Sequence, residues 1–472
     1  MIRFLHAYFP TRTVVLGISE ACLVSLAFVA AAFVRLGAED TSVMLNYENG
    51  STKIVIVAAA FIACMYYFDL YDSSILSNRR EVFIRFIQVL GTMCIILAFV
   101  YYLFPPLEFG RGISLIGLVF VALLVSIWRK LFSLVNSAPQ FADRALILGD
   151  GPLVEPIVRE FTSRPELGLR VVGHVLPTGR GTNLLKYHLA ESSEVCPEPD
   201  AGEDISFFVK SLRVDRIVVA LGERRGNLPV ARLLALKCSG VRIQDGTDLY
   251  EAITGKVPID CVRSGWLLFS SGFQVSRFLT AYKRCASTIM SIIGLVLGLP
   301  LIPFIALAIR LSSPGPILYR QRRVGRGGAA FYCYKFRTMR ADAEADTGPT
   351  WAADDDPRIT SVGRFLRRSR LDEIPQLWNV LMGDMSLVGP RPERPEFVER
   401  LRQDIPFYDL RHTIRPGITG WAQISYRYGA SVEDAKEKLC YDLFYIKNMS
   451  LGLDLLIYFR TIKIILLGRG AR

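Results

Sequence analysis

Two carboxylates stand side by side near the C-terminal end of the chain, inside a run of positive charges. Asp372 and Glu373 belong to the stretch SRLDEIPQLWNVLMGDMSLVGPRPE, residues 369–393. The arginines that flank the pair are Arg367, Arg368, Arg370, Arg391 and Arg394. An ionised aspartate can attack phosphorus when guanidinium groups and a divalent cation neutralise the phosphate. The stretch therefore suggests phosphoryl chemistry.

We expect the two acids to lie at the start of a helix. Ser369 and Asp372 have the spacing of an N-cap box. Pro375 suits a first helical turn, and Gly383 can end the helix. Helix amides favour ionised carboxylates and attract phosphate, and neighbouring carboxylates supply oxygen ligands to Mg²⁺. Acid pairs at helix starts are also common as simple capping residues, so the surrounding residues must decide between the two interpretations.

Several cations are placed on rigid turns. Lys335 and Arg337 lie on a predicted hairpin. Arg391 stands between two prolines, the second of which is Pro392, and Arg415 precedes a further Pro-Gly pair. Cations held on stiff turns beside carboxylates indicate the binding of a diphosphate.

Composition indicates a membrane protein. The chain has 472 residues, of which 51% are hydrophobic, and its mean hydropathy is +0.31. The net charge of +12 fits a cytoplasmic face that meets anionic lipid, and no nucleic-acid motif occurs, so no nucleic-acid partner is expected. The nine cysteines include no Cys-x-x-Cys pair and only four histidines are present, so no zinc site is expected.

Four apolar segments in the first part of the chain are candidates to span a bilayer. They cover residues 13–34, 54–68, 84–104 and 113–128. Basic residues precede the first segment, lie between the second and third, and follow the fourth, which is the pattern of cytoplasmic loops. Everything after residue 130 is therefore expected to begin in the cytoplasm.

An α/β pattern follows. Strands are expected from Arg144 and over residues 169–177, 214–223 and 240–246, with a helix over 228–237, which suggests a doubly wound, Rossmann-like parallel sheet. The turn Gly149-Asp150-Gly151 lacks the third glycine of the dinucleotide-binding pattern, so a simple tight turn is favoured. The domain is expected to be regulatory or structural.

A fifth apolar segment covers residues 288–311. Lys283 and Arg284 precede it and further arginines follow it, so both flanks carry the cytoplasmic signature. Pro300 and Pro303 interrupt it near the centre. We expect a helix that enters the membrane, breaks near Pro300 and returns to the same face, with a kinked spanning helix as the alternative. A basic amphipathic stretch, residues 451–467, is expected to lie in the interface.

From about Lys283 to the C-terminus the chain resembles the bacterial sugar transferase family. These are the polyprenyl-phosphate hexose-1-phosphate transferases that initiate exopolysaccharide, capsule or O-antigen synthesis. The matching motifs are SPGPILYRQRRVG, YKFRTM, LDEIPQLWNVLMGDMSLVGPRPE and RPGITGWAQISYR. The remaining chain is similar to the large members, and the whole resembles the exosortase-associated subgroup. The family often has Ser-Pro at the membrane break, where this chain has Leu299-Pro300.

The resemblance implies a two-step reaction with Mg²⁺ as cofactor. Asp372 attacks the β-phosphate of a nucleoside diphosphate sugar, expected to be a UDP sugar, and polyprenyl phosphate then accepts the phosphosugar. Glu373 binds the metal with Asp372 or accepts a proton, and these roles stay open. Arg367 matches a position proposed to meet the lipid phosphate. The remaining substrate-binding candidates are Lys335, Arg337, Arg391, Pro392 and Arg415.

The expected architecture is therefore membrane α plus α/β. It comprises a four-helix transmembrane region (1–135), a Rossmann-like cytoplasmic domain (140–265) and a monotopic catalytic domain (278–472) whose re-entrant helix covers about 285–311. The protein is expected in the bacterial inner membrane with its soluble domains facing the cytoplasm, in contact with membrane lipids, and a homodimer is compatible with this layout. The alternatives are a non-enzymatic membrane nucleotide sensor and a membrane-bound sugar nucleotide dehydratase or reductase, although the chain lacks the Tyr-x-x-x-Lys pair of the latter.

Overall fold

The structure, a computed structural model, divides into two compact units. The first covers residues 9–246 together with 1–2, and the second covers residues 247–472 together with 3–8. The structure describes residues 2–466 except for 5–6, 48, 73–74, 76–78, 137–141, 165–166, 179–180, 186–204, 223–227, 262–266, 268–269, 271, 275, 344–355, 427–428 and 430. Glu223 and Leu467, the last residues of two predicted elements, lie outside this set.

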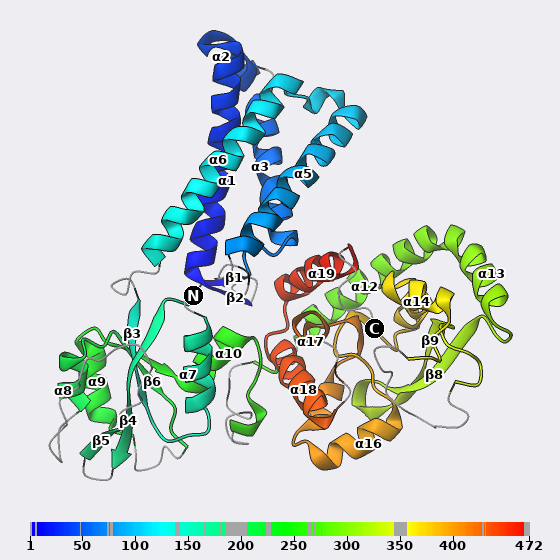
Figure 1. Cartoon of the computed structure of the whole chain (residues 1–472). Helices are drawn as coiled ribbons and strands as arrows, with labels where there is room; N and C mark the ends of the chain where they lie inside the picture. Colours follow the sequence, from blue (N-terminus) through cyan, green and yellow to red (C-terminus); the bar gives the residue numbers. More distant parts are fainter. Residues whose placement is uncertain are drawn as a thin grey trace. The chain divides into compact units, whose positions relative to one another are not determined.

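The first unit begins with long apolar helices (Figure 1). Four of them match the four segments predicted to span the bilayer: α1 (Thr11–Leu36), α3 (Gly50–Tyr67), α5 (Arg79–Leu103) and α6 (Arg111–Asn136). The second and third predicted segments each end one residue beyond their helix. The connections include α2 (Ala38–Tyr47) and η1 (Pro105–Leu107). Each of the four is long and apolar enough to cross a membrane. Side chains such as Phe28, Phe61 and Met93 fill the space between them, whereas many other apolar side chains face outward.

A buried ion pair joins the first and last of these helices. The Arg129 guanidinium donates to the Glu20 carboxylate at 2.6 Å, and the Tyr71 hydroxyl donates to the same carboxylate at 2.7 Å. Glu20 is fully buried. Arg129 is one of the basic residues that the orientation prediction counted after the fourth segment, so part of that charge is neutralised inside the bundle.

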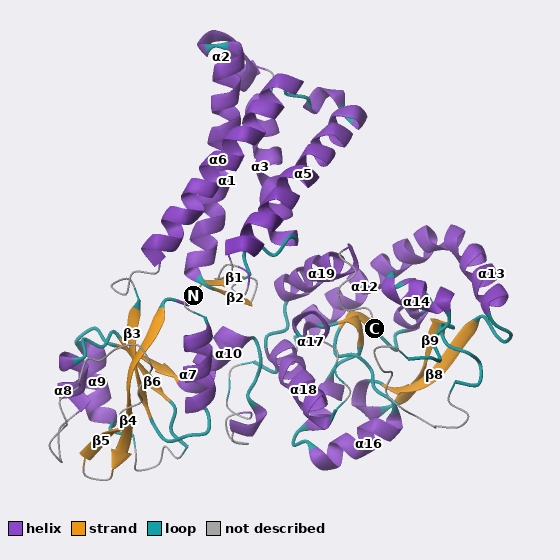
Figure 2. Ribbon diagram, viewed as in Figure 1, coloured by secondary structure: helices purple, strands orange, loops and turns teal. Residues whose placement is uncertain are grey.

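The α/β part of the first unit is built on a five-stranded sheet. Its strands are β3 (Asp143–Leu148), β4 (Leu169–Thr178), β5 (Gly181–Leu185), β6 (Arg216–Val219) and β7 (Arg242–Asp245), in the order β5-β4-β3-β6-β7. All neighbours pair in parallel except β4 and β5. The predicted parallel sheet is confirmed, with β5 as an unforeseen antiparallel edge. In Figure 2, α7 (Val154–Ser163) lies on one side of the strands, and α8 (Ile205–Ser211) and α9 (Val230–Cys238) lie on the other.

The glycine turn after β3 is filled by the chain itself. Gly149 has a φ of 137°, and a Cβ there would lie 2.4 Å from the backbone of Ala220. The Gly151 N–H donates to the Ala220 carbonyl at 2.9 Å. The Asp150 carboxylate accepts from the Gly222 N–H at 3.3 Å. Close packing of two strand ends therefore accounts for both glycines without a ligand.

The second unit carries a broken apolar helix. Helix α12 (Arg277–Gly298) ends in a 3₁₀ turn, η5 (Leu299–Leu301), and the chain continues as α13 (Ile302–Ser312). Pro300 lies in that turn, at the predicted break, because proline cannot donate to the preceding turn of a helix. The helix changes direction there (Figure 1). An antiparallel hairpin follows, formed by β8 (Leu318–Val324) and β9 (Ala330–Phe336) around η6 (Arg326–Gly328), as predicted.

Short elements complete the second unit. They are α10 (Gly246–Thr254), which starts at the boundary, η4 (Ile259–Cys261), α14 (Ser361–Arg368), η7 (Leu371–Glu373), α15 (Gln376–Met382), β10 (Ser386–Val388), α16 (Pro395–Asp404), η8 (Tyr408–Thr413), β11 (Gly417–Thr419), α17 (Trp421–Ser425), α18 (Val432–Lys447) and α19 (Leu451–Leu466). Strands β10 and β11 pair in parallel. Helix α19 is the predicted amphipathic stretch, and its Asp454 binds Lys283 of α12 at 2.5 Å.

Candidate active site

The acid pair lies on a 3₁₀ turn between two helices. Asp372 and Glu373 belong to η7, and Arg370 before them has a φ of 60°. The predicted N-cap box is wrong, because the Ser369 hydroxyl donates to carbonyls at the end of α14 instead. The predicted helix end is confirmed, since Gly383 terminates α15 with a φ of 96°. The acids are therefore presented by a strained corner rather than by the N-terminus of a long helix.

Glu373 is held by three cations. Its carboxylate lies 2.8 Å from the Arg391 guanidinium, 3.3 Å from the Lys335 ammonium and 3.5 Å from Arg370. Burial alone would raise the pKa of Glu373. The charges of Arg391, Lys335 and Arg370 outweigh burial and hold that pKa well below its usual range. Glu373 therefore favours its ionised form and holds these cations in place.

Asp372 is in the opposite situation. Its side chain is buried, and its Oδ1 atom has no hydrogen-bond partner among the described residues. Burial raises the pKa of Asp372 and the neighbouring Glu373 raises it further, against the opposing charges of Lys335 and Arg391. Two adjacent carboxyls with opposite pKa shifts indicate two different roles. A buried carboxylate oxygen without a partner is costly in a folded protein, and a catalytic role is one reason for keeping it.

Lys335 and Arg391 reach the acids from two separate elements. Lys335 lies on β9, which Asn379 of α15 holds in place by bonding the Tyr334 N–H at 3.1 Å and the Tyr332 carbonyl at 2.7 Å. Burial and the charge of Arg391 lower the pKa of Lys335. The helix that follows the acid pair thus also fixes the strand that carries their lysine.

The turn that presents Arg391 is anchored from behind. Arg411 donates to the Arg391 carbonyl at 2.9 Å and pairs with the buried Asp442 at 2.9 Å. Arg323 of β8 donates to the Pro392 carbonyl at 2.9 Å. Pro392 therefore takes part through its backbone.

Three residues with positioning roles were missed by the sequence analysis: Asn379, Arg411 and Asp442. Each acts across a long stretch of chain, from 20 residues for Arg411 and Arg391 to 47 for Asn379 and Tyr332. No local spacing reveals such pairs.

The remaining predicted cations lie in different places. The Arg367 guanidinium donates to the Thr338 hydroxyl at 2.9 Å, and its charge acts on Asp372. Arg337 is buried and donates to the Ser313 and Pro314 carbonyls, each at 2.7 Å, which satisfies the end of α13.

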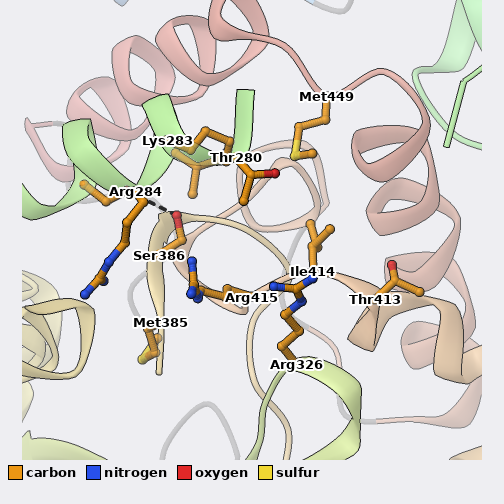
Figure 3. A pocket seen from close by; sticks show the side chains of 12 residues that line it. Thr280, Lys283, Arg284, Arg326, Met385, Ser386, Thr413, Ile414, Arg415 and Met449 are labelled. Atoms are coloured by element: carbon orange, nitrogen blue, oxygen red, sulfur yellow. Dashed lines mark hydrogen bonds between the residues drawn. The ribbon is translucent and has the colours of Figure 1, made fainter. Parts of the chain in front are cut away.

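Arg415 lines a separate cavity (Figure 3). The structure thus brings together Asp372, Glu373, Lys335 and Arg391, with Arg367 near them, but turns Arg337 and Arg415 elsewhere. A phosphate-binding role for these two stays a prediction.

The acid pair has few carboxylate oxygens left that could bind a metal ion. Among the described residues, no three His, Cys, Asp or Glu side chains gather in a way that could hold a metal ion. Both Glu373 oxygens already face cations, whereas Asp372 Oδ1 lacks a partner. This fits Mg²⁺ bound by one carboxylate and by substrate phosphates. It does not favour Glu373 as a second ligand.

Comparison with known proteins places the chain in one family. The model of the family described as bacterial sugar transferase matches residues 278–468. The UDP-glucose:undecaprenyl-phosphate glucose-1-phosphate transferase of Xanthomonas campestris pv. campestris is 32% identical over 73% of this chain and 72% of its own length. The chain belongs to the bacterial sugar transferase family. The resemblance drawn from the sequence motifs is confirmed.

Other relatives match different shares of the chain. The UDP-N-acetylgalactosamine-undecaprenyl-phosphate N-acetylgalactosaminephosphotransferase of Aeromonas hydrophila is 39% identical over 61% of this chain and 66% of its own length. The exopolysaccharide production protein PSS of Rhizobium leguminosarum bv. phaseoli is 40% identical over 38% of this chain but 92% of its own length. A chain that is shorter than the second unit, and that this chain matches over nearly its whole length, thus exists in the family. The named activities support the predicted enzyme class, glycosyl-1-phosphate transferase.

Proposed function

We propose that this sugar transferase moves a sugar 1-phosphate from a nucleoside diphosphate sugar to polyprenyl phosphate at the cytoplasmic face of the bacterial inner membrane. The nucleotide is UDP and the lipid undecaprenyl phosphate, as in the names of the relatives. The product starts an exopolysaccharide or O-antigen chain. The observation that carries this proposal is the unpartnered Oδ1 of buried Asp372 beside Lys335 and Arg391.

In the first step Asp372 acts as the nucleophile. Its carboxylate forms a bond to the β-phosphorus while the bond from that phosphorus to the bridging oxygen breaks. Nucleoside monophosphate leaves with the electron pair, and an aspartyl phosphosugar remains. In the second step a phosphate oxygen of the lipid attacks the same phosphorus and releases the Asp372 carboxylate. Because burial raises the pKa of Asp372, the charge of its ionised form is poorly compensated, which favours attack on phosphorus.

The cations around the pair have a defined task. Lys335 and Arg391 face Glu373 and act electrostatically on Asp372, so they reduce the repulsion between the nucleophile and an incoming diphosphate. Glu373 keeps these cations in place and ionised. Mg²⁺ bound by Asp372 and the diphosphate would neutralise further phosphate charge. Arg367, close enough to act on Asp372, is our candidate for the lipid phosphate.

The broken helix positions this site at the membrane. Its break at Pro300 is flanked by apolar side chains that face outward, such as Leu297 and Phe304, which are 70% and 72% exposed. Lys283 and Arg310 mark its two polar ends. We propose that the helix enters and leaves on the cytoplasmic side, which the basic residues on both flanks favour. Cysteines placed at both ends should react with a membrane-impermeant reagent from the cytoplasm only, and labelling from opposite sides would contradict this.

Release of nucleoside monophosphate tests the reaction directly. The full chain in undecaprenyl phosphate-containing nanodiscs is given Mg²⁺ and a panel of UDP and GDP sugars. The proposal expects release that depends on both the lipid phosphate and one or a few UDP sugars. A sensor would bind nucleotide without release, and a dehydratase would change the sugar without releasing the monophosphate. Either result would reject the transferase.

A further inference from the structure

A cationic cavity lies in the second unit, and the acid pair does not line it. Its volume is about 80 Å³, and its lining includes Arg284 of α12, Arg326 of the η6 turn and Arg415 (Figure 3). None of the described residues that line it is acidic, and none of them belongs to the acid-pair cluster. One water needs ~10–15 Å³ of such volume. A tetrahedral oxyanion therefore has room.

The three arginines in this cavity have no acidic partner among the described residues, whereas Lys283, which also lines it, pairs with Asp454. Arg284 donates to the Val380 and Leu381 carbonyls at the end of α15, which are neutral partners. The guanidinium groups of Arg326 and Arg415 have no hydrogen bond or ion pair with any other described residue. Burial lowers the pKa of Arg415, and the charges of Arg284 and Arg326 lower it further. Like charges held together in this way are relieved by an anion.

The frame around these arginines is rigid. Arg415 precedes a turn whose backbone packs on the turn that presents Arg391: the Gly417 N–H donates to the Pro390 carbonyl at 2.8 Å, and the Gly389 N–H to the Thr419 carbonyl at 2.9 Å. One paired scaffold thus directs Arg391 to the acid pair and Arg415 to the cavity.

The rest of the lining is partly apolar. Met385, Ile414 and Met449 contribute to the wall. In Figure 3 these three side chains surround the space into which Arg326 and Arg415 extend. Two guanidiniums beside an apolar wall suit a phosphate that carries an organic group, because each part of such a ligand finds a matching surface.

We propose that this cavity binds a phosphate ester, with the phosphate between Arg326 and Arg415 and the organic part against Met385, Ile414 and Met449. The phosphate belongs either to a bilayer lipid or to a soluble ester. The site is separate from the proposed transfer reaction and does not depend on it.

Binding without turnover tests the proposal. Phosphate affinity of the full chain is measured by calorimetry in neutral detergent with glycerol 3-phosphate as the soluble probe. Thermal unfolding is compared in phosphatidylcholine nanodiscs with and without phosphatidylglycerol. The variants are Arg326→Gln and Arg415→Gln. Arg322→Gln, at an exposed arginine of β8, is the matched control, and Lys335→Met reports on binding at the acid pair.

We expect Arg326→Gln and Arg415→Gln to weaken binding by about tenfold or more, as for loss of a charge-assisted hydrogen bond, while Arg322→Gln and Lys335→Met retain it. If the two variants lose affinity for glycerol 3-phosphate, the ligand is a soluble ester. If they lose the thermal stabilisation that phosphatidylglycerol gives the unaltered protein, the ligand is a lipid. Equal binding by Arg326→Gln and the unaltered protein, or no response to either probe, would overturn the proposal. Because no sugar nucleotide is present, failure of the transferase assay leaves this result unaffected. If Arg415→Gln does not fold, Arg326→Gln, at an exposed turn, decides alone.

Discussion

The turn after strand β3 and the turn before helix α15 both place short, constrained segments against neighbouring chain. In the first, the backbone of Ala220 occupies the space that a side chain at Gly149 would need. In the second, Arg370 adopts a φ of 60° and Asp372 is buried with one oxygen unpartnered. The polar groups of the first turn bond to neighbouring chain, so its glycines are explained by close backbone packing alone. The second leaves a polar group unsatisfied beside cations, which indicates chemistry.

The contrast continues within the acidic turn. Glu373 has three cationic partners and a lowered pKa, whereas burial raises the pKa of Asp372. One acid thus stabilises the fold and the other is available to a substrate. Substitutions in the two turns should therefore separate activity from stability.

Removing the nucleophile should have the largest effect. We expect Asp372→Asn to lower nucleoside monophosphate release by roughly 10⁴-fold or more, as for other covalent nucleophiles. Its free energy of unfolding should stay the same or rise by about 1 kcal/mol at pH 7, because a buried carboxylate with a raised pKa is costly when ionised. Turnover assays and denaturant titration measure both. Retained turnover would remove Asp372 from the mechanism.

Glu373→Gln should act mainly on stability. Without the anion, the half-buried Arg391 and Lys335 lose the buried carboxylate that neutralises them, so the free energy of unfolding of the second unit should fall by about 3 kcal/mol. Turnover should fall too, because the cations lose their positions. Chemical unfolding in detergent gives the measurement. A variant as stable as the unaltered protein would show that Glu373 does not organise the cluster.

Gly149→Ala should disturb only the turn after strand β3. The positive φ and the close Ala220 backbone predict a loss of about 2 kcal/mol in the stability of the α/β part, with unchanged turnover per folded molecule. Gly222→Ala is the matched control, since a Cβ there meets its nearest neighbour at 3.6 Å. Comparable losses in both variants would contradict the packing explanation.

The smallest predicted effect is on pH dependence. Asp372 must be ionised to attack, so turnover should fall on the acid side at a pH above the value of an ordinary aspartate. Because the Lys335 charge lowers the pKa of Asp372, Lys335→Met should move this limb to higher pH, by up to about one unit. The pH profile of residual turnover measures the shift, with Arg322→Met as control. A shift to lower pH would mean that another group titrates.

Local chemistry made part of this structure predictable from the sequence. Pro300 and Gly383 stop helices for steric reasons that need no tertiary context, and both act where expected. The strands of the sheet could likewise be predicted from short apolar runs in the sequence. The acid pair with Lys335 and Arg391 followed from residue types and from motifs that resemble a family.

The parts that could not be predicted depend on distant partners. Arg337 satisfies carbonyls at the end of α13, and Arg129 neutralises Glu20 across 109 residues. The sequence shows an arginine in each case but not the partner that it meets. The same holds for the N-cap box at Ser369, where the preceding helix claims the hydroxyl.

The covalent intermediate is the most direct test of the central claim. The full chain in detergent is incubated with the active UDP sugar and Mg²⁺ without lipid acceptor, quenched with acid and analysed by intact and peptide mass spectrometry. We predict a mass increase of one sugar phosphate on the peptide that contains Asp372, absent in Asp372→Asn and discharged by undecaprenyl phosphate. Full turnover without such an adduct, or an adduct on Glu373, would contradict the account.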